Sequence, residues 1–158
     1  MIELVNVDKS VAIKFQIVGY QFIEEVSSGD DDWCNLEINL KHNGKLFNKV
    51  DPAIDANELN RLYQWFYSLS INTLPRYAHL SFTEPCISFK FLAKKNSTTR
   101  IAINLSHELK PKFKLTQLRQ ESNDWNIVFE LSEKDFKSIL NSLSDSIKKY
   151  PVRNKANK

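Results

Sequence analysis

DDDWCNLEINL, from Asp30 to Leu40, passes from three consecutive carboxylates into a strict two-residue alternation. Successive side chains of a β-strand point to opposite faces of its sheet, so this pattern predicts a half-buried strand. Its inner, core-joining face consists of Cys34, Leu36, Ile38 and Leu40. Its outer face consists of Trp33, Asn35, Glu37 and Asn39. With an acidic loop at its entrance, the outer face has the character of a surface that meets a partner.

The segments on either side of this strand predict an antiparallel arrangement. Before it, alternation from Val11 to Ile17 predicts a strand that continues past a bend near Gly19, and residues 2–7 suggest a short edge strand. After it, Asn43-Gly44 predicts a tight hairpin with a return strand over Leu46–Val50. Links this short connect antiparallel strands, because parallel crossovers need many more residues.

Two helices are expected. Asp55 is a good N-cap with Glu58 three residues later, followed by an apolar stripe at helical spacing. Ser132, with Asp135 three residues later, starts the second helix, which ends before Pro151. Between the helices the alternation predicts four further strands, and Leu115–Asn123 is ambiguous. The fold class is therefore α+β: a curved, mostly antiparallel β-sheet of about six to eight strands with two amphipathic helices packed against it.

Composition places the chain among ordinary soluble globular proteins. Its 158 residues are 42% hydrophobic and 26% charged, and we expect a single domain over residues 1–150. The net charge is +3, but residues 148–158 carry five basic residues and no acidic ones, so the rest of the chain carries −2. We expect residues 151–158 to be a basic, flexible C-terminal tail. A nucleic-acid-binding protein more often carries its positive charge on the folded body.

Cysteine content and hydropathy indicate in which cellular compartment the protein is expected. Cys34 and Cys86 are far apart, and each lies in an apolar strand pattern, which is typical of reduced core residues. The N-terminus lacks the pattern of a signal peptide, and no segment approaches the ~18–20 apolar residues of a membrane span. We therefore expect a cytoplasmic protein that does not associate with membranes.

No catalytic or cofactor motif is evident. The three histidines, His42, His79 and His107, have no metal-ligand spacing, and only three glycines argue against a phosphate-binding loop. We expect no catalytic residue, no cofactor and no metal. Asp30–Asp32 lack the alternating spacing of a calcium loop, so they form either a solvated turn or, where they have a specific role, a surface that attracts a basic partner. Trp33 and Trp65 are either partner anchors or core residues, whereas Trp125 heads a core-facing alternation and is structural.

Several segments recur in a familiar order. They are GYQF (19–22), DWCNLEI (32–38), LNRLYQWF (59–66), LSFTEPCISF (80–89), INLSHE (103–108) and YPVR (150–153). In this order, from about Val11 to Arg153, the chain resembles the WapI-family immunity proteins of bacterial contact-dependent toxin systems. The resemblance implies a non-enzymatic protein that binds and neutralises the C-terminal domain, typically a tRNA nuclease, of a cognate secreted polymorphic toxin.

A nuclease that binds RNA phosphates needs a basic surface, which carboxylates and an aromatic anchor can engage. We therefore expect the partner-binding residues to be Asp30, Asp31, Asp32, Trp33 and Glu37. The identity of the toxin, the face that binds it and the oligomeric state, including a homo-oligomer, stay open at this point.

Two rival functions stay open as well. The first is an RNA- or nucleotide-binding module, although nucleic acid is the less expected partner, that uses the Lys148–Lys158 tail with Arg61, Arg76, Lys90, Arg100 and Lys112. The second is a hydrolase that uses Glu84, Glu108 and His107, which depends on whether these residues converge in a cleft.

Overall fold

Strand β3 (Trp33–His42) lies inside a four-stranded antiparallel sheet of order β1-β2-β3-β4. The computed structural model describes residues 1–24, 32–117 and 120–153. In this sheet β1 is Ile2–Val5, β2 is Val11–Tyr20 and β4 is Lys45–Asp55. The inner face of β3 is buried as predicted. Asn43 and Gly44 both have positive φ, +48° and +79°, which is the backbone that a tight two-residue hairpin requires.

Strand β4 continues well beyond the predicted end at Val50. A bulge opposite Cys34 and Asn35 carries β4 on to Asp55, the N-cap of the first helix. Pro52 is tolerated because β4 is an edge strand of its sheet, so the missing N–H interrupts no interior ladder. The irregularity between Ile17 and Gly19 in β2 confirms the bend predicted there.

The second half of the chain forms another four-stranded antiparallel sheet of order β10-β7-β6-β5. Its strands are β5 (His79–Ser81), β6 (Ile87–Lys95), β7 (Thr98–Leu105) and β10 (Trp125–Leu131). A short 3₁₀ helix, η1, covers His107–Leu109. The ambiguous segment forms β8 (Leu115–Gln117), paired with β9 (Gln120–Ser122). The described residues thus form ten strands, more than the predicted six to eight, and confirm the α+β class.

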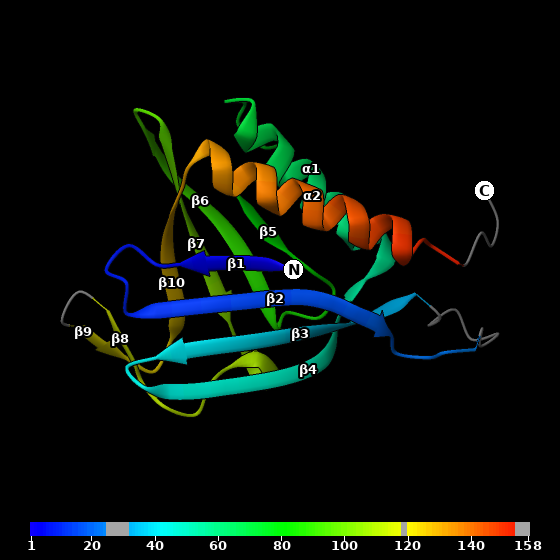
Figure 1. Ribbon diagram of the computed structural model, residues 1–158, viewed down its shortest axis with the longest axis horizontal. Helices are drawn as coiled ribbons and strands as arrows, with labels where there is room; N and C mark the ends of the chain where they lie inside the picture. Colours follow the sequence, from blue (N-terminus) through cyan, green and yellow to red (C-terminus); the bar gives the residue numbers. More distant parts are fainter. Residues whose placement is uncertain (25–31, 118–119, 154–158) are drawn as a thin grey trace.

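The core lies where the two sheets face each other, with their strands crossing in projection (Figure 1). Phe15 of β2 and Phe89 of β6 pack with ring centroids 6.2 Å apart. At one corner the sheets are joined by a backbone hydrogen bond from Val7 to Val128 at 3.2 Å. Burial of each of these aromatic side chains stabilises the fold by about 2–3 kcal/mol.

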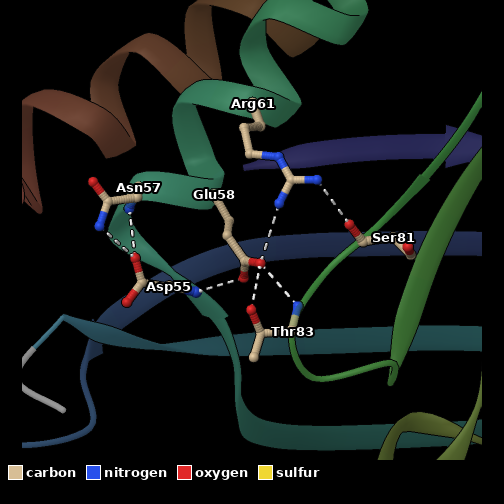
Figure 2. A network of polar contacts seen from close by, with 6 residues as sticks. All are labelled: Asp55, Asn57, Glu58, Arg61, Ser81 and Thr83. Atoms are coloured by element: carbon tan, nitrogen blue, oxygen red, sulfur yellow. Dashed lines mark hydrogen bonds and ion pairs between the residues drawn. The ribbon is translucent and has the colours of Figure 1, made fainter. Parts of the chain in front are cut away.

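Helices α1 (Ala56–Ser70) and α2 (Glu133–Lys149) pack on one another along the open side of the sheets (Figure 1). Each begins with the predicted capping box, Asp55 with Glu58 and Ser132 with Asp135. Glu58 is only 5% exposed and also binds Thr83, so the start of α1 is tied to the second half of the chain (Figure 2). Neither described helix is long and apolar enough to cross a membrane.

Two of the three tryptophans are core residues. Trp125 is fully buried, which confirms its predicted structural role, and its indole N–H donates to the Phe113 carbonyl at 2.9 Å. Trp65 is 4% exposed and donates to the Tyr77 carbonyl at 3.0 Å. Of the two roles left open for Trp65, the structure therefore supports core packing.

Candidate functional site

The predicted partner-binding residues occupy different environments. Trp33 and Glu37 are half-buried on β3, and Glu37 accepts a hydrogen bond from the Gln16 amide of β2 at 2.7 Å. Asp30 and Asp31 lie outside the described residues. Asp32 is 3% exposed, and its carboxylate accepts the Arg153 backbone N–H at 2.7 Å. The position of Asp32 is therefore that of a residue that holds the chain together, whereas Trp33 and Glu37 reach the surface.

Trp33 lies in an open depression of about 570 Å³ that the sequence alone did not reveal. The depression gathers segments that are distant in the sequence: the residues just after β2, the start of β3, β4, the turn before β6, and η1. Its lining comprises Gln21, Phe22, Trp33, Asp51, Pro52, Glu84 and Glu108. Three carboxylates and two aromatic side chains thus share one surface. We call it the acidic depression.

Local hydrogen bonds bring η1 against the turn that carries Glu84. The Ser106 N–H donates to the Cys86 carbonyl at 2.9 Å, and the Ser106 hydroxyl donates to the Pro85 carbonyl. Glu108 and Glu84 therefore line the same depression, which answers whether these two acids converge. His107 precedes Glu108 with a φ of +47° and is not among the lining residues. Of the three residues of the hydrolase hypothesis, Glu84 and Glu108 thus share one depression and His107 does not line it.

The carboxylates of the acidic depression differ in protonation behaviour. Burial raises the pKa of Asp51, and the neighbouring charges of Glu108 and Glu84 raise it further, against an opposing effect of Lys49. Hydrogen bonds from its own backbone N–H and from the Cys86 thiol lower the pKa of Glu108. Three acids close enough to repel one another favour a cationic group at this surface.

Asp51, Cys86 and Glu108 have potential metal-ligand atoms within 4.8 Å of one another. Burial raises the pKa of the Cys86 thiol to about 11, and its hydrogen bond to Glu108, 3.4 Å long, raises the pKa as well. Metals bind the thiolate form of cysteine, so a metal at this position would have to displace the Cys86 proton. In this geometry Cys86 acts as a hydrogen-bond donor that orients Glu108.

The described cations of the RNA-binding hypothesis occupy several environments, with Arg61 and Arg76 lining one depression and Lys90 another. Arg61 on α1 pairs with Glu58 at 3.5 Å and donates to the Ser81 carbonyl at 3.3 Å. Arg100 on β7 is paired with Glu130. Lys90 lines a separate polar depression, and Arg76 lies over the Tyr77 ring. Pairing with carboxylates reduces the positive potential available to RNA phosphates.

Sequence reasoning singled out Trp33, Glu84 and Glu108 but missed Asp51, Gln21 and Phe22. Asp51 was missed because the return strand was expected to end at Val50, one residue earlier. The pairing of Leu36 with Asp51 shows that the strand continues in the same register, and the bulge follows only between Pro52 and Ile54.

Comparison with known proteins bears on function directly. A protein-family model, the Immunity protein WapI-like family, matches residues 4–151. No curated protein and no solved structure gives a significant match. Because the family match covers nearly the whole chain, including every described residue of the acidic depression, the chain belongs to the WapI-like immunity protein family.

Proposed function

We propose that this protein binds and neutralises the C-terminal, tRNA nuclease-type domain of a cognate secreted polymorphic toxin. Its membership of an immunity protein family supports a non-enzymatic role with a toxin protein as partner. In this proposal the protein acts in the cytoplasm of the toxin-producing cell and its siblings and needs no cofactor. In this proposal Trp33 and Glu37 of β3 contact the toxin, as do Asp30 and Asp31, which lie outside the described residues.

The observation that carries the proposal is the placement of Trp33 beside Asp51, Glu84 and Glu108 in one open depression. A nuclease binds the phosphates of its substrate with Lys and Arg side chains, so its active face is basic. Carboxylates opposite that face accelerate encounter and favour the correct orientation. A half-buried tryptophan among them offers a large apolar anchor of the kind that dominates interface energies.

The geometry favours binding over catalysis. The acids lie in an open depression, whereas acid–base catalysis on a substrate depends on a site that orients the reacting atoms and excludes water. Asp32, the buried member of the predicted set, contributes to the surface indirectly, because its backbone and carboxylate fix the start of β3. Contact with the toxin is therefore assigned to Trp33, Glu37 and the carboxylates of the acidic depression.

The test is inhibition of tRNA cleavage by the purified toxin domain encoded beside this gene. Wild-type protein is expected to abolish cleavage at stoichiometric ratio. Trp33→Ala should weaken binding by about 2 kcal/mol, roughly 30-fold in affinity. Glu121→Gln on β9 is the matched control, since this exposed acid lies outside the acidic depression. Undiminished cleavage at saturating wild-type protein would contradict the proposal.

A further inference from the structure

Arg153, near the C-terminus, contacts both ends of the connection between β2 and β3. Its guanidinium lies 3.8 Å from the ring centroid of Tyr20 and donates to the carbonyls of Phe22 at 3.1 Å and Ile23 at 3.3 Å. At the other end of the connection, the Arg153 backbone N–H donates to the Asp32 carboxylate at 2.7 Å. One residue therefore joins three points of the chain that are more than a hundred positions away in sequence.

The position of Arg153 is fixed from the helix side. Tyr150, the C-cap of α2, is buried and packs edge-on against Tyr20, with ring centroids 5.5 Å apart. The Tyr20 hydroxyl donates to the Pro151 carbonyl. These contacts hold residues 151–153, the first part of the predicted tail, against the body, and residues 154–158 lie outside the described part of the chain. Because α2 is packed on α1 and the first sheet, Arg153 is attached to a rigid support.

The chain that Arg153 holds forms one wall of the acidic depression. Gln21 and Phe22 line this depression together with Trp33. The Gln21 backbone N–H donates to the Trp33 carbonyl at 2.7 Å, so the wall is joined to β3 at that point. Beyond it, the Phe22 and Ile23 carbonyls are bound by the Arg153 guanidinium. The placement of Phe22 beside Trp33 therefore depends on this side chain.

We infer that Arg153 is a positioning residue for partner binding, which orders the Gln21–Phe22 wall beside Trp33 before the partner arrives. The inference rests on the proposed function. A wall that is ordered in the free protein costs less conformational entropy on association than one that must be ordered by the partner. Arginine is suited to this role because its planar guanidinium can donate to two carbonyls while stacking on an aromatic ring, which a lysine ammonium cannot do.

The experiment compares wild type with Arg153→Lys and Arg153→Ala. Amide hydrogen exchange at Gln21 measures the order of the wall, and calorimetric titration with the toxin domain measures affinity. In Arg153→Lys we expect both the Gln21 exchange rate and the dissociation constant to rise about tenfold, since two hydrogen bonds to carbonyls are lost. The melting temperature of Arg153→Lys should fall only modestly, because the substitution keeps a positive charge near the buried Asp32, which Arg153 pairs with at 3.9 Å. Should Arg153→Ala fail to fold, the lysine variant carries the test.

Two controls isolate the guanidinium. Arg100→Lys makes the same substitution at a half-exposed arginine, paired with Glu130 on the second sheet, and should leave Gln21 exchange and affinity unchanged. Deletion of residues 154–158 removes the tail charges but keeps Arg153, and should also change neither. Wild-type affinity and wild-type Gln21 exchange in Arg153→Lys would overturn the inference, as would lost Gln21 protection with wild-type affinity. Absence of any binding by the wild-type protein would instead contradict the proposed function, and Gln21 exchange would still report on positioning.

Discussion

The backbone N–H of Thr83 donates to the carboxylate of Glu58 at 2.8 Å, across 25 positions of sequence. The same carboxylate accepts from the Thr83 hydroxyl at 3.0 Å and from the Asp55 N–H at 3.2 Å (Figure 2). Glu58 is thus both the acidic member of the α1 capping box and the anchor of the segment between β5 and β6. That segment leads directly to Glu84 in the acidic depression. The hydrogen bonds of Glu58 to Thr83 therefore hold the residue next to Glu84 against the start of α1.

Glu58→Gln should therefore destabilise the protein by about 2 kcal/mol, because an amide nitrogen would face buried donors that need an acceptor. Chemical denaturation measures the change. The matched control is Asp135→Asn in the capping box of α2, where the carboxylate serves Ser132, and the cost should be about 1 kcal/mol. Equal losses in the two variants would show that the bonds of Glu58 to Thr83 add nothing to capping.

His42 joins the first sheet to strand β8. Its position before a hairpin turn in the sequence does not predict this contact. The residue is buried, its Nδ1 lies 2.9 Å from the Ser10 carbonyl, and its Nε2 accepts the Thr116 N–H at 2.9 Å. These partners define a neutral imidazole that is protonated on Nδ1. The ring also stacks on Phe113.

His42→Phe retains the packing but leaves the Thr116 N–H and the Ser10 carbonyl without this partner. We expect a loss of about 2–3 kcal/mol in stability and faster amide exchange at Thr116. His79→Phe on β5, where the histidine is exposed, should be close to neutral. Wild-type exchange at Thr116 in His42→Phe would show that the β8–β9 pair is held by other contacts.

The parts of the fold that follow from periodicity and capping were predictable, since they depend on neighbours in sequence. The alternation of β3, the Asn43-Gly44 hairpin and both capping boxes are of this kind. Three other features could not be predicted from neighbouring residues. They are the burial of Trp65, the contact that His42 makes between sheets, and the convergence of Asp51 with Glu84 and Glu108. They depend on how the two sheets meet and on how far β4 continues past Val50, and no short sequence pattern encodes either.

The two cysteines should be poorly reactive in the folded protein. Burial raises the pKa of the Cys34 thiol to about 12 and that of Cys86 to about 11, and only the thiolate is nucleophilic. At pH 8 we expect an aromatic disulfide reagent to modify neither thiol on the time scale of minutes, and both after denaturation. Glu108→Gln is the informative variant, because it removes the carboxylate that accepts a hydrogen bond from the Cys86 thiol and raises its pKa. In Glu108→Gln the rate of modification by the reagent should be higher than in wild type at Cys86 and unchanged at Cys34.

Asp51 should make stability depend on pH in a defined direction. Because its folded-state pKa is raised above the ordinary 3.8, the folded protein binds this proton more tightly than the unfolded chain. The favourable contribution is therefore complete below 3.8 and is lost as pH rises through the folded-state pKa. Asp51→Asn should then melt higher than wild type at pH 7, with the difference shrinking toward pH 3. Parallel stability profiles for the two proteins across this range would contradict the interpretation.

Association with the toxin domain should depend on salt through Glu84 and Glu108. Removing one carboxylate from the acidic depression reduces long-range attraction to a basic partner, so Glu84→Gln and Glu108→Gln should slow association several-fold at low ionic strength. The Debye length falls to about 8 Å at 0.15 M salt, and the difference from wild type should narrow there. Stopped-flow mixing resolves association from dissociation. Glu121→Gln removes one charge outside the acidic depression and controls for net charge. If all three variants slowed association equally, the overall charge of the protein, and not the acidic depression, would steer the partner.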